Sequence, residues 1–158
     1  MTQRVGDRRR SREFALQMLF QLDLSPSDLD HAVEAFWADK NTSDAVREFS
    51  EEIVRGTMAR REALDEVLSS VTLNWRITRM AVVDRNVLRM ALYEFLFQPD
   101  TPRVVVIDEA IEIGKKFGND ESGPFINGVL DAIRVRLDEG DLVLPDSLRG
   151  PAEAHGAV

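Results

Sequence analysis

A run of arginines near the start of the chain is the pattern with the clearest chemistry. Within five positions the sequence places Arg8, Arg9, Arg10 and Arg12. A guanidinium group presents a planar fork of N–H donors that matches the oxygens of a phosphate. Phosphate neutralisation in turn supplies much of the affinity of a protein for nucleic acid. We therefore interpret these arginines as contacts to RNA, and the alternative left open is an arm that is only solvated.

An aromatic ring follows the arginines on the same predicted helix. Phe20 lies eight residues after Arg12, and a ring beside a cationic segment could stack on an unpaired base. The alternative for Phe20 is packing in the core, and the residues alone favour it.

The remaining candidates for chemistry do not combine into a catalytic or metal site. Asp108, Glu109 and Glu112 have the spacing of a metal site or an acid–base pair, but a solvated helix face explains them as well. The two histidines, His31 and His155, have no evident partner for catalysis. The sequence contains no cysteine, which removes thiolate nucleophiles and most zinc sites. We expect no enzymatic activity, no cofactor and no metal.

Charge is distributed unevenly along the chain. Residues 1–13 contain five arginines against Asp7 and Glu13, a local charge of +3. Because the whole chain carries −8, residues 14–158 carry −11. An acidic surface repels phosphate at long range, so nonspecific binding to nucleic acid is disfavoured. The composition is that of a soluble globular protein, without a 20-residue apolar run or a secretory signal, and predicts a cytoplasmic location.

The elements that must position these residues are predicted to be helices throughout. Apolar residues recur at three- and four-residue steps, and no segment shows sustained alternation, so the fold class is all-α. Ser25-Pro26, Thr101-Pro102 and Ser122-Gly123-Pro124 have the residue types of helix starts. The predicted helices cover 9–22, 25–37, 43–68, 80–97, 103–117 and 122–137. We expect one helical RNA-binding domain over 1–140, with a basic arm at 1–13, and a flexible tail over 141–158.

Three sequence blocks carry a resemblance to a known family. They are RRRSREFALQMLFQLD, RMAVVDRNVLRMALYEFLF and TPRVVVIDEAIEIGKKFGNDESGPFINGVLDAI, at 8–23, 79–97 and 101–133. In this order and spacing they resemble the NusB family, over nearly all of residues 7–138. The resemblance implies an all-α fold of two perpendicular three-helix bundles with short connections.

The same resemblance implies a function and a set of site residues. The function is that of an RNA-binding transcription antitermination factor, which binds the boxA RNA of ribosomal RNA leaders together with the ribosomal protein NusE. This pair helps RNA polymerase to read through terminators. By position, the arginine run with Phe20 and Phe125 is expected to bind RNA, and Asp84 and Glu121 to lie at the NusE surface. Phe20 stands where the family often has tyrosine, so no hydroxyl contact is expected there.

Two alternatives keep the helical fold but change the function. One is a protein-only helical adaptor or homodimer with a solvated arm. The other is an RNA-binding accessory domain of an RNA methyltransferase system, which the absence of a cofactor-binding βαβ unit disfavours. The salt dependence of RNA affinity would separate the protein-only alternative from RNA binding by the arm, because phosphate contacts release counterions.

Overall fold

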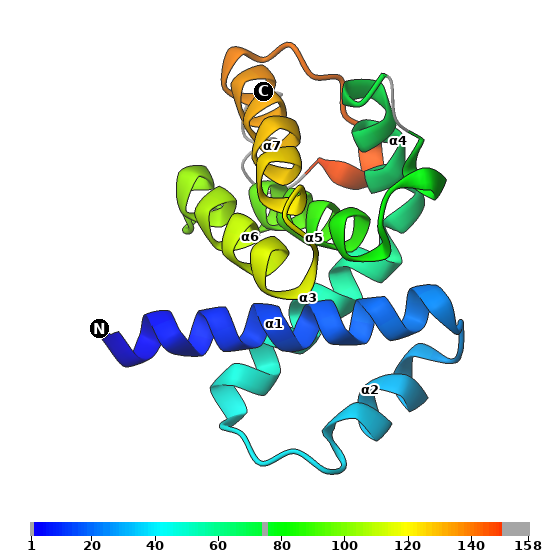
Figure 1. The fold of residues 1–158 in the computed structure, drawn as a ribbon, viewed down its shortest axis with the longest axis vertical. Helices are drawn as coiled ribbons and strands as arrows, with labels where there is room; N and C mark the ends of the chain where they lie inside the picture. The colour runs from blue at the N-terminus through cyan, green and yellow to red at the C-terminus, as the bar shows by residue number, and fades with distance from the viewer. Residues whose placement is uncertain (1, 74–75, 150–158) are drawn as a thin grey trace. The chain divides into compact units, whose positions relative to one another are not determined.

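The structure is a computed structural model that describes residues 2–73 and 76–149. Within these ranges it contains seven α-helices and two short 3-10 helices, and no strand (Figure 1). The all-α prediction is therefore confirmed. None of the helices in the described ranges has the length and apolar character needed to cross a membrane.

The chain divides into two compact units, Met1–Ala59 and Arg60–Val158, which we call unit 1 and unit 2. The division falls inside the segment 43–68, for which we predicted a single helix. That prediction is wrong, because Arg60 leaves the helical conformation with φ −117° and ψ 15°. The helices α3 (Asp44–Ala59) and α4 (Arg61–Val71) lie on either side of it. The apolar spacing continues on both sides of Arg60, so periodicity alone does not reveal the break.

Unit 1 consists of α1, α2 and α3, and α1 contacts the other two helices (Figure 1). The helix α1 spans Thr2–Leu24 and α2 spans Leu29–Trp37. We predicted that α2 begins at Ser25-Pro26, but the carboxylate of Asp28 caps it by accepting a hydrogen bond from the His31 backbone N–H at 3.0 Å. An acid at this position also favours the positive end of the helix dipole, which explains the later start.

Three aromatic rings hold α1 against α2. The ring of Phe14 meets the rings of Phe36 and Trp37 edge-on, with centroids 5.8 and 5.4 Å apart. Phe36 and Trp37 also meet each other edge-on at 5.1 Å. Edge-to-face contacts of this kind contribute about 0.5–1.5 kcal/mol each beyond the burial of their surface. The end of α2 is thus fixed to the middle of α1.

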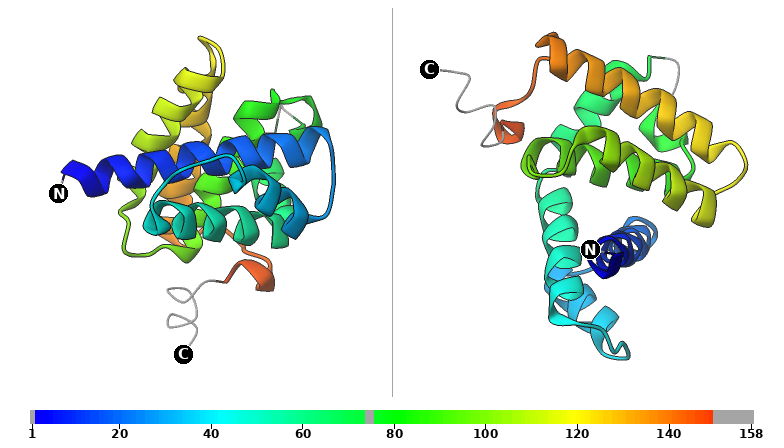
Figure 2. Two further views of the ribbon diagram at one scale, coloured as in Figure 1. Left: turned by 90° about the horizontal axis from the view of Figure 1, so that it is seen from below. Right: turned by 90° about the vertical axis from the view of Figure 1, so that its left-hand side faces the viewer.

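Unit 2 is built around α5 (Val82–Phe97), which contacts α4, α6 and α7. Every residue of α5 from Asn86 to Leu96 is buried, as predicted for the central buried helix. The helices α6 (Arg103–Phe117) and α7 (Ser122–Glu139) lie side by side (Figure 2). A short 3-10 helix, η1 (Ile77–Arg79), precedes α5.

The end of α7 turns the chain back onto unit 2. Gly140 adopts the left-handed conformation with φ +73°, which favours glycine because it has no Cβ. The Asp141 backbone N–H then donates to the Arg136 carbonyl at 2.9 Å, a bond typical of a helix C-terminus closed by glycine. The chain continues directly into residues 141–149.

Residues 141–149 differ from the flexible tail that we expected from residue 141 onward. They contain the 3-10 helix η2 (Asp146–Leu148), and Leu148 is fully buried. The Arg60 guanidinium donates to the Ser147 carbonyl at 3.3 Å, which ties this segment to the start of unit 2. Burial of Leu148, together with Leu144, offsets the entropy lost on ordering. The rest of the expected tail, residues 150–158, lies outside the described residues.

Candidate nucleic-acid interface

The four arginines of the predicted arm lie on α1, but they do not share one environment. We expected them at the start of the first helix, whereas α1 already begins at Thr2. Arg9 and Arg10 are exposed, Arg8 is half-buried, and Arg12 is only 4% exposed. Because successive residues of a helix point about 100° apart, a run of four cannot face the same way. Arg9 and Arg10 are the two exposed members of the run, and the Arg10 guanidinium carbon lies 5.4 Å from the ring centroid of Phe14.

Arg8 and Arg12 pack instead against α3. Their guanidinium carbons lie 3.7 and 5.6 Å from the ring centroid of Phe49, within the range of cation–π attraction. Between them, the Ser11 hydroxyl donates to the Val46 carbonyl at 2.9 Å. These contacts hold the arginine run of α1 against α3, so Arg9 and Arg10 belong to a packed helix.

Phe20 lies further along α1 at the edge of a pocket. Its ring is half-buried and lines a cavity of about 680 Å³ formed by α1, α2 and the loop between them. His31 and Lys40 line the same cavity, and the Lys40 ammonium lies 3.8 Å from the ring centroid of Phe36. Phe20 therefore borders a cavity whose lining includes the cationic Lys40, and the Lys40 ammonium pairs with Asp39 at 3.3 Å.

A second pocket brings together three predicted site residues that are distant in the sequence. Asp84 on α5 lines a cavity of about 190 Å³ with Glu121 and Phe125. Asp84 is 8% exposed, and its Oδ1 atom has no hydrogen-bond partner within the described structure. A buried acceptor without a partner costs about 1–3 kcal/mol, unless a ligand supplies the donor. We call this site the acidic pocket.

The loop between α6 and α7 fixes the far wall of the acidic pocket. The Asn119 side-chain oxygen accepts a hydrogen bond from the Glu121 backbone N–H at 2.8 Å. The Ser122 hydroxyl in turn accepts one from the Asn119 backbone N–H at 3.0 Å. Glu121 is exposed and Phe125 is half-buried one turn further along α7. An acid and an aromatic ring are thus held at the mouth of the pocket by a short, hydrogen-bonded loop.

Sequence reasoning missed Arg79, which also lines the acidic pocket. Arg79 ends η1, three residues before α5, and its side chain is exposed. Single arginines are common on surfaces, so the sequence offered no signal that set it apart. The acidic pocket therefore combines a cation, two carboxylates and an aromatic ring. Such a set of groups is suited to binding a partner. Among residues 2–73 and 76–149, no group of three or more His, Cys, Asp or Glu residues could hold a metal ion.

The chain matches a known protein family. The sequence model described as "NusB family" matches residues 9–134. Among curated relatives, the transcription antitermination protein NusB of Koribacter versatilis (strain Ellin345) is 45% identical over 139 residues, covering 87% of this chain and 95% of the relative. The protein of the same name from Anaeromyxobacter dehalogenans (strain 2CP-1) is 48% identical over 131 residues, covering 82% and 92%.

Solved structures have the same fold. NusB from T. maritima matches with a TM-score of 0.74 and 40% identity, covering 80% of this chain and 89% of that one. A chain from a crystal structure of the antitermination factors NusB and NusE in complex with dsRNA matches with a TM-score of 0.74, covering 81% and 96%. Its identity is 24%, so it supports the fold alone.

Proposed function

This chain belongs to the NusB family, and from that premise we propose that it is an RNA-binding transcription antitermination factor of the cytoplasm, without catalytic activity. It binds boxA RNA together with the ribosomal protein NusE and helps RNA polymerase to read through terminators. The observation that carries the proposal is the acidic pocket, where Asp84, Glu121 and Phe125 meet and a buried carboxylate oxygen lacks a donor.

The RNA strand is held by charge and by stacking. Arg9 and Arg10 are exposed on a rigid helix and neutralise phosphates. Phe20 and Phe125, each half-buried at a pocket, offer ring faces to unpaired bases. Phosphate contacts position the strand and base contacts select it. Arg8 and Arg12 contribute by holding the helix that carries Arg9 and Arg10.

The protein partner is received by the acidic residues. Ribosomal proteins are typically basic, and a negative surface attracts a positive partner and fixes its orientation. Asp84 offers Oδ1 to a donor of NusE, and the exposed carboxylate of Glu121 lies at the mouth of the same pocket. RNA and NusE together form more contacts than either makes alone, so neither interaction has to be tight by itself.

The direct test measures binding of the full chain to a fluorescent boxA RNA and to a scrambled RNA of equal length and composition, with and without NusE. We expect a lower dissociation constant for boxA RNA, and a further decrease when NusE is present. Equal weak binding to both RNAs, unchanged by NusE, would contradict the proposal and favour a protein-only adaptor.

Neutralising the acidic pocket should weaken the contribution of NusE. In the variant Asp84→Asn/Glu121→Gln the side chains keep their size but lose their charge, and Asp84 lies in a desolvated site. We expect NusE to bind roughly tenfold more weakly, a change of ~1.4 kcal/mol. Isothermal titration calorimetry with NusE measures this change.

The matched control is Asp108→Asn/Glu112→Gln, which removes two exposed charges from α6. It should leave NusE affinity within about twofold of wild type, because exposed charges away from the contact are screened by salt. If both variants lose the same affinity, the effect is one of net charge, and the acidic pocket is not the NusE site.

A further inference from the structure

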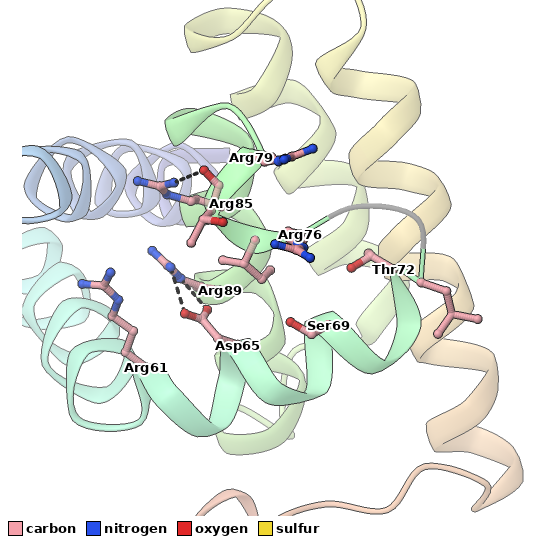
Figure 3. A pocket seen from close by; sticks show the side chains of 11 residues that line it. Arg61, Asp65, Ser69, Thr72, Arg76, Arg79, Arg85 and Arg89 are labelled. Carbon is pink, nitrogen blue, oxygen red and sulfur yellow. Dashed lines mark hydrogen bonds and ion pairs between the residues drawn. The ribbon is translucent and has the colours of Figure 1, made fainter.

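A second concentration of arginines lies in unit 2, far from the first run in the sequence. A cavity of about 730 Å³ between α4, η1 and α5 is lined by five arginines and one acid (Figure 3). The charged lining residues are Arg61, Arg76, Arg79, Arg85, Arg89 and Asp65. We call this cavity the arginine pocket. Neither the sequence patterns nor the acidic pocket accounts for it.

The acid of the arginine pocket is already engaged. Asp65 accepts two hydrogen bonds from Arg89, at 2.7 Å from Nε and 2.9 Å from Nη2. Arg89 is only 3% exposed, so this bidentate pair is a structural feature at the base of the pocket. The described lining contains no other carboxylate, and the remaining arginines give the pocket a net positive charge.

Arg76 and Arg79 are the side chains best placed to meet a ligand. Both are exposed, and they lie on either side of the buried Ile77, in and next to η1. Figure 3 shows Arg76 in the centre of the view, above Ser69 of α4, and Arg79 further up, near Arg85. Gathering like charges costs electrostatic free energy, and packing of Arg76 and Arg79 does not offset that cost, because they are exposed. A bound anion would offset it.

The chemistry of the lining favours phosphate. Guanidinium forks bind phosphate oxygens with two parallel N–H···O bonds, and several forks around one cavity suit a ligand that carries several phosphates. The arginine pocket adjoins the acidic pocket, since Arg79 lines both. RNA with a base stacked on Phe125, at the mouth of the acidic pocket, therefore lies close to the arginine pocket.

We infer that the arginine pocket binds the phosphates of the RNA that flanks the base stacked on Phe125, at the mouth of the acidic pocket. This inference rests on the proposed function and extends it, since it gives the protein a second phosphate contact, in unit 2, for RNA outside the recognised element. The contact reads no bases, so it strengthens binding of any flanking sequence.

The test compares two RNAs, the boxA element alone and the same element extended by ten nucleotides on each side, and uses the variant Arg61→Gln/Arg76→Gln. These arginines come from two different elements of the arginine pocket and do not line the acidic pocket. We expect unchanged affinity for the short RNA and a loss of roughly 10- to 30-fold for the extended RNA at about 0.1 M salt. The slope of log K against log salt should become less steep by about 1.4, which is 0.7 for each lost phosphate contact.

The matched control is Arg136→Gln/Arg149→Gln, which removes two exposed charges of unit 2 elsewhere. It should bind both RNAs like wild type. Equal losses in the control, or no loss of extended RNA in the test variant, overturn the inference. If wild type binds boxA and scrambled RNA alike, the proposed function itself has failed, so the two failures are distinguishable.

Inorganic phosphate separates an RNA strand from a small phosphate compound as the ligand. Titrated alone and followed by NMR, it should bind the arginine pocket only at tens of millimolar, because one phosphate engages few of the forks. Submillimolar binding of inorganic phosphate, combined with an unchanged affinity of the double variant for extended RNA, would assign the pocket to a small ligand. An acidic protein as the ligand would likewise leave RNA affinity unchanged.

Discussion

Replacing both Arg9 and Arg10 by alanine is expected to weaken binding of boxA RNA by roughly 10- to 30-fold at about 0.1 M salt, while the fold is kept. Each lost phosphate contact on a single strand changes the slope of log K against log salt by about 0.7, which is about fivefold in affinity at this concentration. Both side chains are exposed, so their removal keeps every buried side chain in place and takes away only the contact of the Arg10 guanidinium with the Phe14 ring at 5.4 Å.

The choice of Arg9 and Arg10 follows from the contacts of their neighbours. Arg8 and Arg12 lie over the ring of Phe49, and Arg12 is buried. Replacing all four arginines would remove these packing contacts together with the exposed charges. A loss of RNA binding in such a variant would then mix unfolding of unit 1 with loss of phosphate contacts. The Arg9→Ala/Arg10→Ala variant separates the two.

Fluorescence anisotropy at several salt concentrations measures this effect, with Arg136→Ala/Arg149→Ala as the control for net charge. The control should stay within about twofold of wild type, and far-UV circular dichroism should be the same for all three proteins. Unchanged affinity of Arg9→Ala/Arg10→Ala would show that the exposed part of the arginine run is only solvated. A solvated arm is the alternative interpretation that the sequence left open for these residues.

Asp65→Ala is expected to lower the free energy of unfolding by about 3–5 kcal/mol, the largest effect on stability that we predict. The change removes the carboxylate that pairs with Arg89 through two hydrogen bonds. Arg89 is 3% exposed and would keep its charge without this partner in a desolvated site. Urea unfolding followed by circular dichroism at 222 nm measures the loss.

Two further variants test the physical reason. Asp131→Ala breaks an exposed pair with Arg134 on α7 and should cost less than about 1 kcal/mol. Asp65→Ala/Arg89→Met removes the charge together with its partner and should recover most of the loss, because no buried charge is left uncompensated. If Asp65→Ala lowers the free energy of unfolding no more than Asp131→Ala does, the burial of Arg89 does not make its pair with Asp65 important for stability.

Much of the local structure could be predicted from the sequence, because helix periods and helix ends are encoded by neighbouring residues. The start of α6 after Pro102 and the end of α7 at Gly140 lie close to their predicted positions. The break at Arg60 and the later start of α2 at Leu29 were missed. In both cases the apolar spacing is compatible with a longer helix, and a single residue's conformation or cap decides where the helix ends or begins.

By itself, the sequence determined the all-α class, the resemblance to the NusB family and the set of residues that could bind RNA and a basic partner, since all of these depend on residue types and short spacings. Only the tertiary structure decided which of those residues are accessible. It buried Arg12 against Phe49 and left Arg9 and Arg10 exposed. It also gathered the acidic pocket and the arginine pocket from separate elements. Contacts between distant segments depend on how the helices pack, and the local periodicity of the sequence does not predict that packing.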